Sequence, residues 1–144
     1  MSLCTLCKTQ LPLSSPEQWT APDGEVVDVD RTAVPSAVVE TSLREFEICE
    51  FCYQRTLPGF FTRQDLAEIH YQFGLEYRDR GQHARNIASL TQALQLCETA
   101  DIFAALAYAE NRLGHRDAAI AYYRRALQID PVHFMSRENL QKLL

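Results

Sequence analysis

The stretch of sequence that most constrains the fold is residues 100–131, which read ADIFAALAYAENRLGHRDAAIAYYRRALQIDP. Apolar and small side chains recur at helical spacing on both sides of Gly114, which predicts two amphipathic helices joined by a short turn. Gly114 can adopt the positive φ angle that ends a helix, and Pro131 suits the first turn of a following helix. Small residues such as Ala107 let two helices approach closely, while large residues fill the remaining space. The stretch therefore predicts an antiparallel helix pair.

This helix pair resembles one unit of the tetratricopeptide repeat (TPR), a helix–turn–helix repeat of about 34 residues. A TPR unit has a bulky, an apolar and a small residue in its first helix, a glycine between its helices, and small and aromatic residues before a closing proline in its second helix. In this chain those places are occupied by Phe103, Leu106, Ala107, Gly114, Ala119, Tyr123, Ala126 and Pro131. Glu110 departs from the pattern, because the family usually has tyrosine there. The resemblance implies a scaffold that binds other proteins.

A second unit of the same kind precedes the first. A shift by one repeat length places Gly81 on Gly114, so residues 67–99 resemble an earlier TPR unit. In this earlier unit Tyr77 stands at the place that Glu110 occupies in the later unit, so it matches the family's tyrosine. Asn86 replaces the small residue expected in the second helix of the earlier unit. The predicted helices are 63–80, 83–97, 100–113, 116–129 and 132–144.

The last of these helices would cap the stack, which gives two units and a capping helix. Thr62 is the expected N-cap of the first helix, with Asp65 in the capping-box position. Stacked repeats bury a continuous core only against neighbours, and about three units are usually needed for stability. We therefore expect the N-terminal part of the chain to cover the open face of the first repeat helix.

Two matched cysteine pairs mark the N-terminal part, Cys4-Thr5-Leu6-Cys7 and Cys49-Glu50-Phe51-Cys52. Two intervening residues place both sulfurs of a pair on the same side of a tight turn, and four thiolates can then close a tetrahedral Zn²⁺ site. The arrangement resembles zinc-ribbon and rubredoxin-like modules, which carry two such knuckles on hairpins. The sequence therefore predicts a structural zinc site with Cys4, Cys7, Cys49 and Cys52 as its ligands.

Other interpretations of these cysteines are unligated core thiols and a redox-active dithiol. A thioredoxin-like pair would begin a helix after a strand in a βαβ unit, and the sequence shows no βαβ pattern. Iron is the alternative metal. Rubredoxin knuckles usually have glycine after the second cysteine, whereas Lys8 and Tyr53 stand there in this chain. Zinc is therefore favoured over iron.

The residues between the cysteine pairs are typical of a small β module. Segments 26–29, 37–41 and 44–48 are rich in β-branched and aromatic residues, and proline- and glycine-containing turns separate them. We expect Trp19, the only tryptophan, to pack against the metal-binding hairpins. The predicted class is α+β, with a zinc-ribbon or rubredoxin-like module at residues 1–58 and an all-α TPR stack at residues 59–144. Phe60 and Phe61 would wedge the two parts together.

Charge and hydropathy exclude some classes of function. The net charge of −5 lies within residues 1–58, because acidic and basic side chains balance in the rest of the chain. Phosphate binding depends on lysine and arginine, so nucleic acid is not an expected partner. No apolar run reaches the roughly 20 residues of a membrane helix, and the N-terminus has no signal-peptide pattern. A cytoplasmic protein is expected, and self-association stays open.

The TPR resemblance also implies where a partner would bind, because the family lines its concave groove mainly with the first helix of each unit. Carried onto this sequence, the groove residues are Glu68, Tyr71, Gln72, Leu75, Arg78, Asp79, Asp101, Ala104, Ala105, Tyr108, Asn111 and Arg112, with Glu138 and Asn139 from the capping helix. Tyr71 and Leu75 stand where carboxylate-clamping TPR domains begin their Lys/Asn set, which disfavours a chaperone-tail clamp. The mixture of tyrosine and arginine suits a peptide that offers aromatic or acidic contacts.

The leading hypothesis is a non-enzymatic adaptor that binds another protein or peptide in its TPR groove. The alternative is a thiol-redox or metal-dependent regulator that senses through its cysteine pairs. The sequence contains no glycine-rich phosphate loop, nucleophile elbow or metalloprotease motif, so catalysis is not expected. The four histidines are interpreted as surface or packing residues, and Cys97 as a core thiol.

Overall fold

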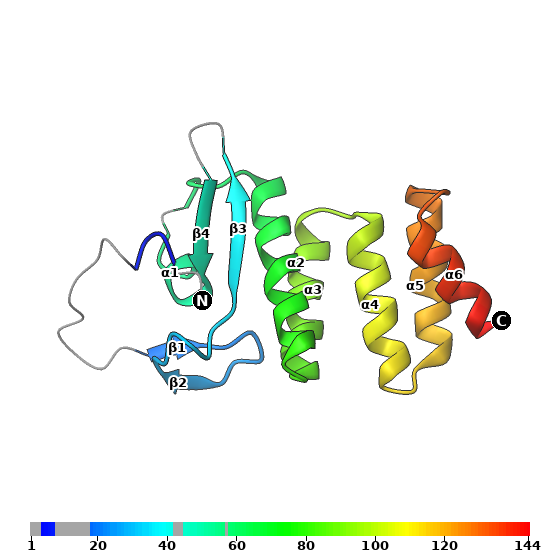
Figure 1. Cartoon of the computed structure of the whole chain (residues 1–144), viewed down its shortest axis with the longest axis horizontal. Coiled ribbons are helices and arrows are strands. Elements are labelled where there is room, and N and C mark those ends of the chain that lie inside the picture. The colour runs from blue at the N-terminus through cyan, green and yellow to red at the C-terminus, as the bar shows by residue number, and fades with distance from the viewer. Residues whose placement is uncertain (1–3, 8–17, 42–44, 57) are drawn as a thin grey trace.

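The computed structural model of the chain describes residues 4–7, 18–41, 45–56 and 58–144. A small β-rich part at the N-terminus is followed by a row of helices, so the class is α+β (Figure 1). The strands are β1 (Gln18–Thr20), β2 (Val26–Asp28), β3 (Ser36–Glu40) and β4 (Glu45–Cys49). The helices are α1 (Glu50–Tyr53), α2 (Arg63–Asp79), α3 (His83–Leu96), α4 (Ala100–Arg112), α5 (Arg116–Ile129) and α6 (Phe134–Leu143).

The β part consists of two antiparallel hairpins. β3 pairs with β4, with Ala37 opposite Ile48, and both residues are buried. β2 pairs with β1, a three-residue strand that the sequence analysis did not predict. The three predicted strand segments correspond to β2, β3 and β4, although Arg44 lies outside the described residues. Trp19 on β1 is buried in the same hydrophobic cluster as Cys4, Cys49 and Cys52, as expected.

The helical part confirms the predicted row of five helices, α2 to α6. The capping box at the start of α2 is present, since the Thr62 hydroxyl accepts a hydrogen bond of 3.1 Å from the backbone N–H of Asp65. Gly81 and Gly114 have φ angles of 73° and 87°, the left-handed conformation that lets each helix end and the chain reverse. These local signals explain why the helix ends could be predicted.

The helix-start interpretation of Pro131 was wrong. Pro131 lies in the turn before α6, and the helix begins at Phe134 after His133, whose ring accepts a hydrogen bond from the Ser136 backbone N–H at 3.4 Å. Cys97 is likewise not a core thiol within a helix. It is the extended C-cap of α3 and is half-buried.

Close packing between the first two repeat helices depends on Gly74. A Cβ atom at this position would lie 2.9 Å from the Cγ and Cδ2 atoms of Leu90, which real Cβ atoms essentially never do. Asn86, which replaces the expected small residue, is buried at the same helix contact, and the carbonyl of Asn86 lies 3.5 Å from that Cβ position. The absence of a side chain at residue 74 therefore brings α2 and α3 together.

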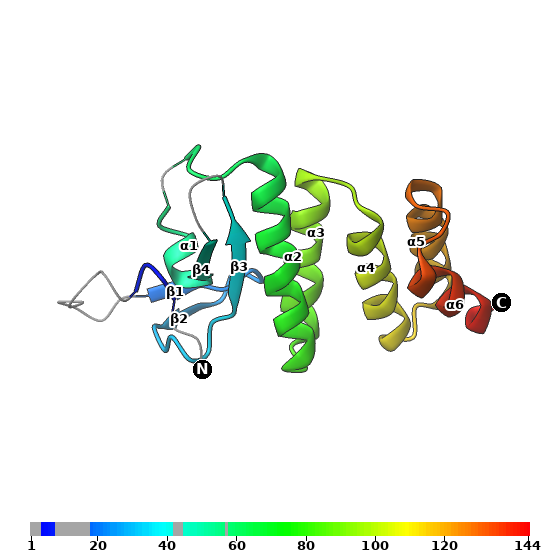
Figure 2. The same ribbon diagram turned by 45° about the horizontal axis from the view of Figure 1, so that its top comes forward.

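Helix α2 lies between the β part and the rest of the helices, with β3 on one side and α3 on the other (Figures 1 and 2). Its largest buried side chains, Ile69, Phe73 and Tyr77, belong to the hydrophobic cluster that contains Trp19 and the buried cysteines. This cluster extends across the predicted boundary at residues 58 and 59. The N-terminal part therefore covers the face of α2 that faces away from the stack.

The backbone edge of β3 is satisfied by side chains of α2. Ser36 N–H donates to Glu76 Oε2 at 2.8 Å, and Val38 N–H donates to Gln72 Oε1 at 2.7 Å. The Gln72 amide also donates to the Val38 carbonyl at 2.8 Å. Alternate residues of a strand and residues four apart in a helix are both separated by about 6–7 Å. The spacing of Gln72 and Glu76 along α2 therefore matches the spacing of the β3 backbone groups that they bind. This helix replaces the neighbouring strand that an edge would otherwise attract.

Aromatic and charged side chains complete the joint. The ring centroid of Phe46 lies 5.8 Å from that of Phe60 and 6.3 Å from that of Phe61, so the two adjacent aromatics contact β4. Farther along the joint, Arg85 of α3 forms an ion pair of 3.2 Å with Asp23 in the β1–β2 connection. The β part is thus attached to both helices of the first repeat.

Candidate functional site: a cysteine cluster and a groove

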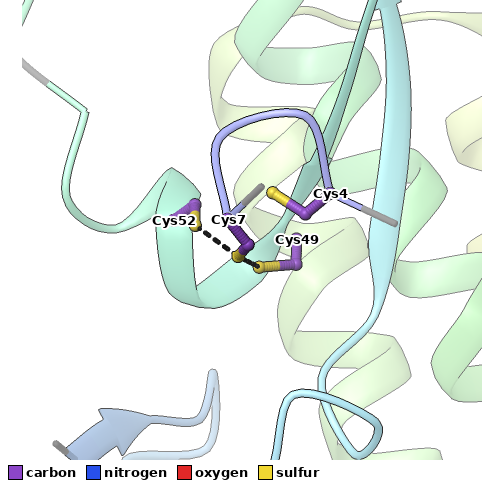
Figure 3. Close-up of side chains that lie close together, drawn as sticks. All are labelled: Cys4, Cys7, Cys49 and Cys52. Atoms are coloured by element: carbon purple, nitrogen blue, oxygen red, sulfur yellow. Dashed lines mark hydrogen bonds between the residues drawn. The ribbon is translucent and has the colours of Figure 1, made fainter. Parts of the chain in front are cut away.

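The two cysteine pairs meet in the structure. Cys4 and Cys7 flank a turn, Cys49 ends β4, and Cys52 lies in α1 (Figure 3). All four Sγ atoms lie within 4.8 Å of one another. A tetrahedral zinc ion with Zn–S bonds of about 2.3 Å holds its sulfurs about 3.8 Å apart. The cluster therefore has the ligand number of a four-thiolate metal site, with Sγ separations from 2.9 Å between Cys7 and Cys52 up to 4.8 Å, on both sides of this value.

Backbone hydrogen bonds hold the two knuckles together. Thr5 N–H donates to the Glu47 carbonyl at 2.6 Å, and Glu47 N–H donates to the Thr5 hydroxyl at 3.0 Å, which fixes the first turn against β4. Glu50 N–H donates to the Pro35 carbonyl at 2.9 Å. The second knuckle is a strand-to-helix junction, whereas the resemblance to zinc ribbons implied a hairpin. A sequence pattern cannot distinguish these, because CxxC spacing is compatible with both.

The electrostatics of the cluster favour a cation. Thiol hydrogen bonds from Cys49 and Cys52 hold the pKa of Cys4 far below its usual range. The Cys4 sulfur in turn raises the pKa of Cys52 and raises that of Cys49 to about 12, because a second thiolate beside the first is opposed. A divalent cation would stabilise all four thiolates together. Four sulfur donors in a tetrahedral arrangement select zinc or iron.

Residues of α1 connect the cluster to α2 through contacts that the sequence analysis missed. Glu50 is 3% exposed and accepts a hydrogen bond from the Tyr77 hydroxyl, and burial raises the pKa of Glu50 to about 7. The Tyr53 hydroxyl lies 2.8 Å from His70 Nε2. Glu50 looks like a surface residue in the sequence, so only the tertiary structure could reveal its role.

His70 should make the stability of the chain depend on pH. Burial lowers its pKa from 6.5 to about 4. Between these values the unfolded chain binds more protons than the folded chain, so the free energy of unfolding rises with pH through this window. The contribution of neutral His70 to the free energy of unfolding is fully present above pH 6.5 and is lost as the pH falls toward 4. The largest loss is about 3 kcal/mol.

The measurement is urea unfolding of the metal-loaded chain at several pH values. His70→Gln should lose part of this slope, because glutamine keeps hydrogen-bonding capacity beside Tyr53 but does not titrate in this range. His83→Gln is the matched control, since His83 is only partly buried at the start of α3. An unchanged slope in His70→Gln would contradict the assignment.

A groove opens on the other side of α2, between this helix, α4 and α6. It is a cavity of about 690 Å³. Ten of the residues that the TPR resemblance implied line it, namely Tyr71, Leu75, Arg78, Asp79, Asp101, Ala104, Ala105, Tyr108, Arg112 and Asn139. Gly81, His133 and Met135 line it as well and are not among the implied groove residues.

The implied groove residues Glu68, Gln72, Asn111 and Glu138 lie outside this cavity. Gln72 is occupied by the edge of β3, and its amide also donates to Glu68 at 3.0 Å. Gln72 therefore faces the β part, and the exposed Glu68 is bound to Gln72. The family pattern could not reveal this, because a helix that begins a longer TPR stack has no strand beside it.

Tyr108 is the centre of a cationic site in the groove. The guanidinium carbons of Arg78 and Arg112 lie 5.9 and 5.8 Å from its ring centroid. Arg78 forms an ion pair of 3.1 Å with Asp79. Arg112 has no carboxylate partner among the described residues, and its nearest polar partner there is the Tyr108 hydroxyl at 3.4 Å. Arg112 thus places a positive charge without a carboxylate partner next to an aromatic ring, while Asp79 and Asp101 balance the two arginines over the groove lining as a whole.

A Ser–His–Asp arrangement also borders the groove. His133 Nε2 lies 2.7 Å from Asp101 Oδ1, and His133 Nδ1 lies 2.8 Å from the Ser136 hydroxyl. Ser136 is completely buried, so its hydroxyl is not accessible to a substrate. The arrangement is a helix cap that attaches the start of α6 to α4.

Comparison with known proteins supports the repeat. Residues 100–133 match the family model of the tetratricopeptide repeat. A thermophilic TPR protein of Thermus thermophilus with a solved structure is 36% identical, with a TM-score of 0.50. The alignment covers 54% of this chain and 40% of that protein. A search of curated proteins found no match. Among the described residues, no helix has the length and apolar character of a membrane span.

Proposed function

We propose that this chain is a protein-binding adaptor. Residues 59–144 would capture a peptide segment of a partner in the groove, and residues 1–58 would form a module built on a structural zinc ion. The observation that carries this proposal is the cavity formed jointly by both repeat units and the capping helix, with Leu75, Tyr108 and Arg112 in its walls. Clefts of several hundred Å³ with an apolar lining and a few placed polar groups are typical binding sites.

The chemistry of the groove favours a segment with an acidic side chain beside an apolar or aromatic one. A carboxylate would pair with Arg112, and an apolar side chain would pack on Tyr71, Leu75 and Ala105. Tyrosine and arginine are also the residues that most often dominate binding energy at interfaces. The proposed partner therefore carries an acidic side chain next to an apolar or aromatic one.

The groove is tested with peptides selected by phage display on the metal-loaded chain. Arg112→Ala and Tyr108→Ala should each weaken peptide binding by about tenfold or more, because each removes part of the Arg–Tyr site. The melting temperature should change little, since both side chains are partly exposed. Arg124→Ala is the control, because Arg124 is exposed on α5 and does not line the groove. Equal binding by all three variants would move the site elsewhere.

The zinc site is tested by elemental analysis of the untagged protein. One zinc per chain is the expected result, with Cys4, Cys7, Cys49 and Cys52 as ligands. One iron per chain would support the four-cysteine site but would contradict zinc as its metal. Cysteine thiolates remain available for metal in reducing compartments, so a cytoplasmic location belongs to this proposal. Nucleic acid is not proposed as a partner.

The second candidate function is a thiol-redox regulator. The Sγ atoms of Cys7 and Cys52 lie 2.9 Å apart, so little movement separates them from a disulfide. Hydrogen peroxide would take two electrons from the two thiolates and be reduced to water, and the metal would lose two ligands. Zinc release and a lower helical melting temperature on mild oxidation would favour this function. Retention of zinc under the same conditions would exclude it.

A further inference from the structure

We infer that the metal centre controls the groove through α2, because this one helix is both the surface on which the metal module packs and a wall of the groove. This inference rests on the proposed function and adds its regulation. Metal loading would set the affinity of the groove for its peptide, although no cysteine lines the groove. Four structural observations lead to this conclusion.

First, metal binding would help to hold α1 in place. It is only four residues long, and Cys49, its N-cap, provides no side-chain cap. Helices of this length are not stable by themselves. Two proposed metal ligands, Cys49 and Cys52, lie at and within this helix. A bound ion would therefore attach α1 to the turn that carries Cys4 and Cys7.

Second, α1 and its neighbours contact one stripe of α2. Tyr53 reaches His70, its ring centroid lies 5.6 Å from that of Phe73, and Glu50 accepts a hydrogen bond from Tyr77. His70, Phe73 and Tyr77 are three and four residues apart, so they share a face of the helix.

Third, the next stripe of α2 faces the groove. Tyr71, Leu75 and Arg78 have the same spacing and line the cavity. Each of these residues lies one or two positions from a residue that contacts the metal module. A rotation or loosening of α2 that breaks its contacts with the metal module must also displace the side chains of α2 that line the groove.

Fourth, the opposite wall of the groove has its own support. Phe103 of α4 packs with Ala126 of α5, and Ala107 packs with Ala119 and Tyr123. The residues of these two clusters all come from the helical part. Loss of metal should therefore alter one wall of the groove and leave the other in place.

Hydrogen–deuterium exchange of the full chain, with and without zinc as the only added ligand, tests the inference. Removal of zinc by a chelator should accelerate amide exchange in α2 by at least about tenfold more than in α5. Unchanged exchange in α2 would overturn the coupling. Uniform acceleration from α2 to α6 would also overturn it, because the metal would then support the whole fold.

Two tyrosine variants locate the connection. Tyr77→Phe keeps the buried ring and removes the hydroxyl that reaches Glu50, so exchange in α2 should accelerate while one zinc per chain is retained. Tyr123→Phe is the matched control, since it removes a buried tyrosine hydroxyl from α5 outside the metal module. Equal exchange of α2 in both variants would show that the hydrogen bond between Tyr77 and Glu50 does not couple the metal module to α2.

Reciprocity provides the last measurement. A phage-selected peptide that loses affinity when zinc is removed must raise the affinity for zinc by the same factor. Zinc affinity that is identical with and without a bound peptide would refute the coupling even if the peptide occupies the groove. Failure of every peptide to bind would refute the proposed function, while the exchange experiment would still decide whether the metal supports α2.

Discussion

Replacement of Cys49 by serine is expected to abolish stoichiometric metal binding and to lower the melting temperature of the helices by about 10 °C or more. A three-sulfur site would lose the tetrahedral ligand set, and metal binding contributes directly to the folding of small modules. Exposure of Ile69, Phe73 and Tyr77 would cost about 1.5–3 kcal/mol for each side chain. In a chain of this size, 1 kcal/mol corresponds to about 3 °C.

The measurement is helical circular dichroism during thermal unfolding, together with elemental analysis. Cys97→Ser is the matched control, because Cys97 is half-buried at the end of α3 and is not part of the cysteine cluster. That variant should keep its metal and melt within about 3 °C of the wild type. If Cys49→Ser lost the metal without any change in helical melting, the module and the repeats would be independent folding units.

Replacement of Phe73 by alanine is expected to reduce the free energy of unfolding by about 3–5 kcal/mol, as for other buried phenylalanines. Phe73 is completely buried in the cluster shared with Trp19 and three of the cysteines. Its removal should also weaken metal retention, because the cavity lies under Tyr53 in α1. Urea unfolding gives the first quantity, and competition with a chelator gives the second.

Phe103→Ala separates these two effects. Phe103 is 5% exposed and packs between α4 and α5, so its loss should be similarly destabilising. Metal retention should remain unchanged in the folded protein, since Phe103 makes no contact with the metal module in its cluster. Equal loss of metal in both variants would show that general destabilisation, and not the shared core, governs the metal site.

The helices were predictable because each one carries its own local signals. Periodic apolar residues define the buried faces, and the capping box of Thr62 and the positive φ angles of Gly81 and Gly114 define ends. The cysteine cluster was predictable for a related reason, because a four-thiolate site requires two matched pairs and the chain has two. These features depend on residues close together in sequence or on the number of ligands that a metal ion requires.

The sequence could not show how the two parts share α2. Gln72 has the helical position of a groove residue, yet its amide pairs with the backbone of β3. Glu50 is an ordinary acidic residue in the sequence, yet the fold buries it under Tyr77. β1 was missed because a three-residue strand carries too little pattern to identify.

The amino-acid sequence by itself therefore determined the elements, the repeat and the four cysteines that form the cluster. Each follows from periodicity, from turn residues or from the donor chemistry of paired cysteines. Only the tertiary structure decided that the cysteine-bearing N-terminal part and the repeats form one core around α2, and which stripe of that helix faces the groove. Those contacts join residues that are distant in the chain, and their energies come from burial and hydrogen bonds that exist only after the chain has folded.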